Sequence, residues 1–166
     1  MNHETKLNKA YFFSVLVLMF ILPVASAITD WLSQGKPPVT MPLIGKWFIF
    51  WAVGARLFLA GLKQAISPGF TAQTIFHIQN KESHVIVREL GFANICFGLT
   101  GIVSLFLPQW RIVSACTSGL FYGIAGINHI VKKPAGPNEA VALASDLFIF
   151  LLLLAYVLFT YIQASV

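Results

Sequence analysis

The sequence predicts an all-α fold, an integral membrane helical bundle with five transmembrane helices. Of its 166 residues, 57% are apolar and 10% charged, whereas soluble domains have about 45–50% apolar and about 25% charged residues. Five apolar runs are each near the ~20 residues that a helix needs to cross ~30 Å of hydrocarbon. Alternation at period two is absent, so a β-barrel is excluded and helices must satisfy the backbone inside lipid.

The five predicted helices are joined by short connections. They cover residues 10–28, 47–66, 86–107, 111–131 and 140–162. Pro108, Pro134 and Pro137 break the chain between the last three helices. A chain of this length has no room for a separate soluble module, so residues 1–166 are expected to form a single transmembrane domain.

The first apolar run has an alternative interpretation as a secretory signal peptide. Lys6 and Lys9 precede it, and it ends in Ala25, Ser26 and Ala27, which resembles a cleavage site. The run is nearly 20 residues long, however, and the apolar region of a signal peptide has about 7–15. We therefore expect a retained helix, which the mass of the intact N-terminus would test.

Two longer connections flank the second predicted helix. Residues 29–46, rich in proline and glycine, are expected to form an outer loop. Residues 67–85 are expected to form the main cytoplasmic loop. Within it, the stretch SPGFTAQTIFHI predicts a short interfacial helix whose apolar side chains dip into the lipid headgroups. These side chains are Phe70, Ile75, Phe76 and Ile78.

The distribution of lysine and arginine predicts a cytoplasmic N-terminus and an outer C-terminus. This orientation places seven basic residues on the cytoplasmic side, namely Lys6, Lys9, Lys63, Lys81, Arg88, Lys132 and Lys133. The outer side then holds three, namely Lys36, Lys46 and Arg111. The four tryptophans fall near the outer ends, as an interfacial belt requires; they are Trp31, Trp47, Trp51 and Trp110.

The expected location is the bacterial inner (plasma) membrane. The net charge of +5 comes from bases that flank apolar runs, which is typical of attraction to anionic headgroups. Because these bases do not cluster on one helix or loop, we expect no nucleic-acid partner.

Ionisable and amide side chains interrupt the apolar runs of the second to fifth helices. Such groups are costly within a membrane and mark either function or a specific pairing. In the predicted orientation they all lie in the cytoplasmic half, with Arg56 about ten residues, or ~15 Å, from that end of its helix. The predicted cluster consists of Arg56, Glu89, Asn94, Asn128, His129 and Asp146.

Arg56 is permanently protonated, so it should pair with Glu89, Asp146 or both. Three explanations of the cluster stay open. It is a structural ion pair that fixes helix register, a polar pocket that binds a small or amphipathic ligand from the cytoplasm, or a proton-relay or transport site. His129 is expected to be an interfacial histidine that caps a helix end.

Small residues form stripes on three predicted helices. The glycines are Gly54 and Gly61, then Gly91, Gly98 and Gly101, then Gly119, Gly123 and Gly126. Small residues let helices approach closely in lipid, and we expect them to pack within the bundle, with a dimer seam as the alternative.

No catalytic residue, metal site or cofactor is predicted. The sequence contains no H-E-x-x-H, G-x-S-x-G or P-loop motif. Cys96 and Cys116 form no C-x-x-C pair and are expected to be buried apolar side chains.

The stretches ARLFLAGLKQAISPGF and RELGFANICFGLTGIVSLFLPQWR resemble the DoxX-like group of small bacterial four-helix membrane proteins. The segments RELGFAN and GINH are similar, more closely, to a bacterial family with a domain of unknown function. The resemblance covers roughly residues 46–160 and implies a four-helix core, to which the first helix is an addition. It implies accessory or assembly roles, with Arg56 and Glu89 as the positions that carry over.

These observations favour a non-enzymatic accessory or assembly protein of the membrane. Its expected partners are the lipid bilayer and a membrane-protein partner, a second copy or a small amphipathic ligand. One alternative is a small-solute or proton-coupled transporter that uses Arg56, Glu89 and Asp146. Another is a membrane enzyme acting on a lipid or quinone, with Glu89 or Asp146 as acid or base and His129 as its partner.

Overall fold

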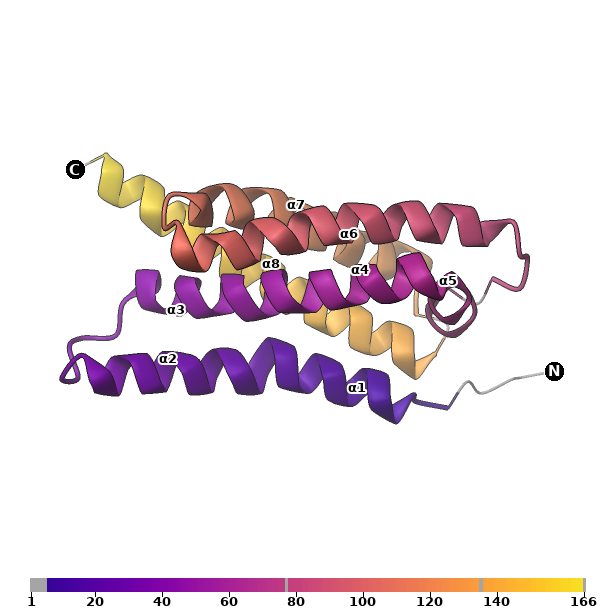
Figure 1. Cartoon of the computed structure of the whole chain (residues 1–166), viewed down its shortest axis with the longest axis horizontal. Helices are drawn as coiled ribbons and strands as arrows, with labels where there is room; N and C mark the ends of the chain where they lie inside the picture. The colour runs from indigo at the N-terminus through magenta and orange to yellow at the C-terminus, as the bar shows by residue number, and fades with distance from the viewer. Residues whose placement is uncertain (1–5, 77, 135, 166) are drawn as a thin grey trace.

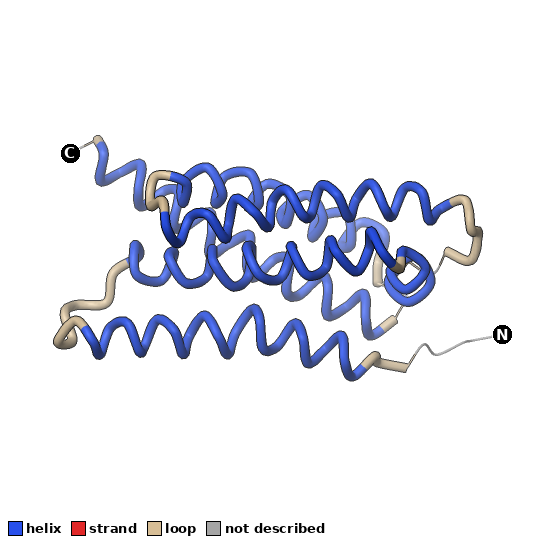
Figure 2. The backbone as a smooth tube through the Cα atoms, viewed as in Figure 1, coloured by secondary structure: helices blue, strands red, loops and turns tan. Residues whose placement is uncertain are grey.

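A computed structural model describes residues 6–76, 78–134 and 136–165, and every regular element in these ranges is helical. The long helices lie alongside one another in an elongated bundle (Figure 1). Short loops connect them at the two ends of the bundle (Figure 2). The predicted all-α class is thereby confirmed.

The first two long helices each contain a π-helical segment. The first consists of α1 (Lys9–Leu16), η1 (Val17–Ile21) and α2 (Leu22–Ser33), and the second of α3 (Met41–Phe48), η2 (Ile49–Ala55) and α4 (Arg56–Ile66). A short helical segment follows, formed by α5 (Pro68–Phe70) and η3 (Thr71–Ile75). The remaining long helices are α6 (Ser83–Phe106), α7 (Trp110–Lys132) and α8 (Pro137–Ala164).

Four of the five long helices are long and apolar enough to cross a membrane, which identifies a multi-pass membrane protein. These spans are Lys9–Ser33, Met41–Ile66, Ser83–Phe106 and Pro137–Ala164. The fourth predicted helix exists as α7, but α7 is not among them. Its serines, together with Asn128 and His129, make it less apolar than its neighbours.

The first two helices extend beyond their predicted bounds. The expected outer loop of residues 29–46 is reduced to residues 34–40, because α2 continues to Ser33 and α3 begins at Met41. Asp30 explains the extension. Its carboxylate accepts hydrogen bonds from Lys46 Nζ at 2.7 Å and Trp47 Nε1 at 2.9 Å. Asp30, which was predicted to lie in a loop, therefore links the end of α2 to the start of α3.

The tryptophans gather at one end of the bundle, as predicted. Figure 1 places the end of α2, the start of α3, the α6–α7 turn and the C-terminus at this end, which we call the tryptophan end. Trp51 Nε1 donates to Ser26 Oγ at 2.9 Å, and Trp31 Nε1 donates to the Pro37 carbonyl at 2.6 Å. The opposite end carries α5 and η3. These two elements lie across that end of the bundle like a cap, so we call it the cap end.

Glycines bring α4, and the segment η2 that precedes it, into close contact with α6. A Cβ atom placed on Gly61 would lie 2.6 Å from the Gly91 carbonyl oxygen, and one on Gly101 would lie 2.5 Å from the Gly54 nitrogen. On the other side of the bundle, Gly123 packs against the Phe150 ring. The predicted packing of glycines within the bundle is confirmed.

The core lies along the bundle axis between the helices. Its fully buried members are Met19, Ile49, Val53, Tyr122, Ile149 and Leu153. The first helix contributes Met19 but remains peripheral, since its most apolar window is 17% buried, against 28–39% in the other three spans.

Candidate functional site

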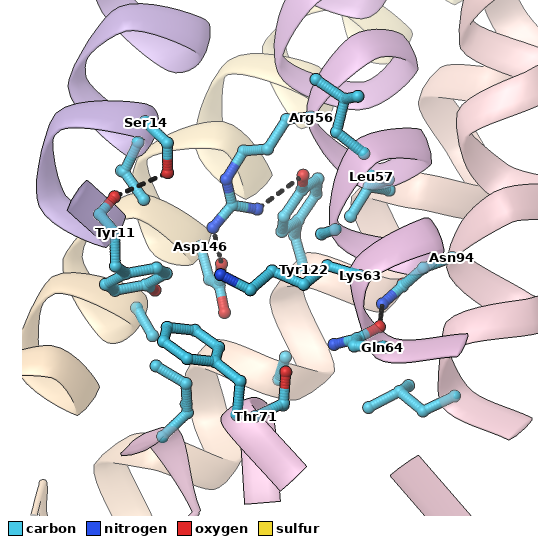
Figure 3. Close-up of a pocket in the computed structure, with 18 of the residues that line it drawn as sticks. Tyr11, Ser14, Arg56, Leu57, Lys63, Gln64, Thr71, Asn94, Tyr122 and Asp146 are labelled. Atoms are coloured by element: carbon cyan, nitrogen blue, oxygen red, sulfur yellow. Dashed lines mark hydrogen bonds and ion pairs between the residues drawn. The ribbon is translucent and has the colours of Figure 1, made fainter. Parts of the chain in front are cut away.

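A cavity of about 470 Å³ occupies the cap end of the bundle. Its wall combines side chains from α1, α4, α5, η3, α6, α7 and α8 (Figure 3). Five of the six predicted cluster residues line it, namely Arg56, Asn94, Asn128, His129 and Asp146. Its volume lies within the roughly 300–1,000 Å³ that small-molecule sites occupy.

Arg56, at the start of α4, lines the cavity and is held in place by Tyr122. Its Nη1 donates to the Tyr122 hydroxyl at 3.1 Å, and that hydroxyl donates to the Ala52 carbonyl at 2.7 Å. The guanidinium carbon lies 5.7 Å from the centroid of the tyrosine ring. The Tyr122 hydroxyl thereby orients the guanidinium as an acceptor, and it donates its own proton to the backbone carbonyl of Ala52.

Asp146 of α8 is the acidic partner of Arg56, as one of the two sequence alternatives predicts. Its Oδ1 lies 3.9 Å from Arg56 Nη2, and the two side chains are 11% and 13% exposed. This separation is an ion pair but too long for a hydrogen bond. Figure 3 shows the guanidinium between Tyr122 and Asp146, with the carboxylate facing the cavity. The pair is therefore open to an additional polar group.

Glu89 is not brought into the cluster. It is exposed, whereas Val87, Gly91 and Asn94 on the same helix are buried. Successive helical residues are rotated by about 100°, so Glu89 points roughly 140° away from Asn94. Of the two carboxylates expected near Arg56, only Asp146 lines the cavity.

Asn94 of α6 has one amide atom paired and one unpaired. Its Nδ2 donates to Gln64 Oε1 at 2.7 Å. Asn94 is only 3% exposed, so water does not readily reach it. Its Oδ1 nevertheless has no hydrogen-bond partner among the described residues. A buried acceptor of this kind costs free energy unless a partner reaches it.

His129 and Asn128 lie where the main cavity meets a second one. The second cavity has a volume of about 330 Å³ and shares both residues with the first. His129 is buried, and its Nδ1 lies 3.0 Å from Glu139 Oε1. His129 does sit in the last turn of α7, but it bonds to a side chain of α8 instead of capping its own helix at the interface. Asn128 is exposed at the rim.

The segment of residues 67–76, here called the cap, forms part of the cavity wall, and its place in the headgroup layer stays a prediction. Thr71 and Ile75 are buried, and Phe70 lines the cavity beneath the Lys63 ammonium, which lies 3.6 Å from the centroid of its ring. Phe76 also lines it but is 39% exposed, and Ile78 is 42% exposed. The predicted interfacial helix is thus a wall of the site, and position 77 of that stretch lies outside the described residues.

Comparison with known proteins yields one family. The sequence model of a family of unknown function, DUF6790, matches residues 13–165. The chain belongs to the DUF6790 family. No curated protein and no solved structure matches it.

The match to DUF6790 begins within α1, so the family includes the first helix. The resemblance to a family of unknown function is thereby confirmed. The expected role of the first helix as an addition to a four-helix core is not supported, because α1 supplies Tyr11 and Ser14 to the cavity wall. The DoxX-like relationship stays a prediction.

Several residues of the site in this DUF6790 member were not predicted. Tyr11, Lys63, Gln64 and Tyr122 line the cavity, and Glu139 holds His129. Helical spacing offers a signal for two of them. Lys63 follows Arg56 by seven residues and Tyr122 precedes His129 by seven, which places each pair on one helix face.

The described residues contain no group of three metal-ligating side chains. Cys96 and Cys116 are exposed on the surfaces of α6 and α7, so the prediction that they are buried is wrong. The chemistry of the cavity consists of two cations, a carboxylate, a histidine, tyrosine hydroxyls and amides on an apolar background.

Proposed function

We propose that all five long helices cross the membrane. Only residues 107–109 separate α6 from α7, and only residues 133–136 separate α7 from α8. Because α6 and α8 both meet the criteria for a span, the helix between them must return from one side of the membrane to the other. Three polar residues of α7 face the bundle, since Ser114, Ser118 and His129 are buried.

The orientation proposed from the basic residues is supported by the positions of the tryptophans. With the N-terminus in the cytoplasm, the cap end faces the cytoplasm and the tryptophan end faces outward. The chain termini lie at opposite ends of the bundle (Figure 1), which suits an odd number of spans. We assign this topology to the bacterial inner membrane.

We propose that the protein is a non-enzymatic membrane accessory protein that binds a small amphipathic ligand at its cap end. One observation carries this proposal: a cavity opens beside the Arg56–Asp146 pair, with polar groups and apolar side chains on the same wall. A purely structural ion pair needs no such space. Close packing around the pair would stabilise it better.

The packing beyond the cavity favours binding over transport. Towards the tryptophan end, the core beyond Arg56 and Asp146 is filled by large apolar side chains. Met19, Ile49, Val53, Ile149 and Leu153 are each 0% exposed. A transporter that couples through Arg56 and Asp146 would have to open this layer, and flux in proteoliposomes abolished by Asp146→Asn would favour that alternative.

Filling the cavity tests the proposed function. Ala60 lines the cavity on α4, whereas Ala93 of α6 is exposed and does not line it. We expect Ala60→Trp to remove amphiphiles that co-purify with the wild-type protein, and Ala93→Trp to retain them. Native mass spectrometry of the three proteins measures this. Equal retention by both variants would contradict a ligand in this cavity.

A further inference from the structure

The cavity holds more positive than negative charge. Arg56 and Lys63 project from one face of α4, and both line the cavity. Asp146 is the one carboxylate on the described part of the same wall, and Glu139 lines only the second cavity, against His129. Arg56 is paired with Asp146, so the excess charge is that of Lys63, which is exposed at the rim, where a cation attracts a counter-ion into the cavity. The wall is therefore suited to an anion.

Lys63 is placed to meet such an anion inside the cavity. Its ammonium lies over the Phe70 ring at 3.6 Å from the centroid, and Figure 3 shows the side chain extending across the cavity on the Asp146 side. Arg56 holds its Tyr122 bond with Nη1, and its Nη2 reaches Asp146 only at 3.9 Å. The space between Arg56 and Lys63 has donors on both sides.

The cavity opens sideways, between the first two long helices. At this opening the exposed lining residues are Ala10 and Ser14 on α1 and Leu59 and Lys63 on α4, while Phe76 and Asn128 are exposed elsewhere on the rim. The α1 pair and the α4 pair are each four residues apart, so each forms one helix edge. Leu59 is 53% exposed and apolar, so a hydrocarbon chain can lie along this opening and continue into the bilayer. A ligand that uses this route comes from the membrane.

The wall formed by α6 contains a buried acceptor that needs a hydrogen-bond donor. Asn94 Oδ1 is buried without a hydrogen-bond partner among the described residues, and its own amide nitrogen is committed to Gln64. Gln64 is adjacent in sequence to Lys63. A ligand that places its anion by Lys63 can therefore offer a hydroxyl to Asn94, which a simple fatty acid lacks.

We infer that the ligand is a single-chain anionic lipid whose headgroup also carries a hydroxyl, of the monoacyl phospholipid class. Its phosphate lies between Arg56 and Lys63, a headgroup hydroxyl donates to Asn94 Oδ1, and its acyl chain leaves between α1 and α4. This inference rests on the proposed function and adds the class of ligand and its source in the bilayer.

Five probes separate the parts of this inference. Lysophosphatidylglycerol has the anion, the hydroxyls and the chain. Lysophosphatidylcholine is zwitterionic, monoolein is uncharged, oleate lacks the hydroxyl, and glycerol 3-phosphate lacks the chain. Binding to the full-length protein in nanodiscs is measured by displacement of tritiated lysophosphatidylglycerol. We expect lysophosphatidylglycerol to bind at least about tenfold more tightly than each of the others, because charge-assisted bonds and chain burial both contribute.

A matched pair of variants tests the charge. Lys63→Gln removes the cation of the cavity, whereas Lys81→Gln removes an exposed cation that lines neither cavity. Lys63→Gln should lower the affinity for lysophosphatidylglycerol about tenfold and leave the affinity for monoolein unchanged. Lys81→Gln should change neither affinity. Both sites are exposed, so folding is retained.

The possible failures are distinguishable. If monoolein or lysophosphatidylcholine binds as tightly as lysophosphatidylglycerol, or if the two lysine variants behave alike, the anionic class is wrong and the amphiphile site stands. If glycerol 3-phosphate binds equally well, the ligand comes from water and the bilayer source is wrong. If none of the five binds, the proposed function itself fails.

Discussion

At the scale of single residues, the arginine of α4 has two partners of different kinds. Tyr122 supplies a neutral hydrogen bond at 3.1 Å, and Asp146 supplies a charge at 3.9 Å. Both residues are buried, at 1% and 8% exposed, and both line the cavity. The guanidinium is thus fixed by the tyrosine and left partly available by the aspartate, which is the state expected of a residue that receives a ligand.

Removing one partner of this pair should destabilise the protein. We expect Arg56→Ala to lower the free energy of unfolding by about 3–5 kcal/mol, because it leaves Asp146 buried without its counter-charge. Arg56→Met combined with Asp146→Leu should restore most of this loss, since both charges are then absent. Thermal unfolding in detergent compares the three proteins, and an unchanged stability of Arg56→Ala would show that Arg56 is solvated.

The two carboxylates that the sequence offered to Arg56 should behave differently. Asp146→Asn changes the wall of the cavity, so we expect at least a severalfold change in the affinity for an anionic amphiphile, in the direction of tighter binding because a repelling charge is lost. Glu89→Gln is an exposed change, which should alter stability by no more than about 0.5 kcal/mol and leave binding as it was. Equal effects of both substitutions on binding would contradict the placement of Glu89.

The residues of the site could be predicted only in part. Rare charges in apolar helices identify Arg56 and Asp146, and their spacing places both in one half of the bundle. Helical spacing places Tyr122 on the face of His129, but its hydroxyl bond to Ala52 could not be predicted, because it depends on helix rotation. Rotation also explains Glu89: its depth was predicted, but its angular position on α6 is fixed only by the glycine contacts with α4.

At the scale of elements, the interface of α4 and α6 has no room for side chains, whereas that of α7 and α8 has some. A Cβ on Gly98 would collide with the backbone of Phe58, but one on Gly119 would lie 3.4 Å from Leu153 Cβ, in ordinary contact. The α4–α6 pair is therefore a rigid unit that sets the positions of Arg56 and Asn94 across the cavity.

Alanine substitutions should distinguish these two interfaces. Gly98→Ala forces the two backbones apart, and we expect a loss of about 1–3 kcal/mol in the free energy of unfolding. Gly119→Ala should be neutral or stabilising by up to about 1 kcal/mol, because alanine favours the helix and the space exists. Thermal unfolding measures both, and a tolerated Gly98→Ala would contradict the close approach to Phe58.

The elements themselves were predicted more fully than their functions. Apolar length predicts all five long helices, because the hydrophobic run is a local property. The cap was predicted as a helix but assigned to the headgroups, since its amphipathic pattern fits a lipid surface and a protein cavity equally well. Only the tertiary structure shows Phe70 and Ile75 on the cavity wall.

At the scale of the whole molecule, both cavities lie at the cap end. The tryptophan end is fastened by Asp30, Lys46 and indole hydrogen bonds, while the cap end contains the cavities. The two ends therefore differ: hydrogen bonds and an ion pair join the helices at one end, and the other end contains the candidate site.

The five-span topology predicts the location of each terminus. A reporter enzyme that is active only in the cytoplasm should be inactive when fused after residue 166 and active when fused within the loop of residues 78–82. Alkaline phosphatase, active only outside the cytoplasm, should give the reverse result. Activity of the cytoplasmic reporter at both sites would mean that α7 does not cross the membrane, and activity at the C-terminus alone would mean that the orientation is inverted.

A contact between the start of the first long helix and the start of the last bears on how the protein is made. The Asn8 amide donates to Asn138 Oδ1 at 2.8 Å, and Asn8 Oδ1 in turn accepts from the Tyr11 amide at the start of α1. Helices emerge from the ribosome in sequence order. The hydrogen bond at the start of the first helix can therefore form only after the last helix has been made. The tight α4–α6 pair can form earlier. The cavity at the cap end is consequently the last part of the protein to be completed, and a nascent chain that stops before residue 138 has no complete cavity wall.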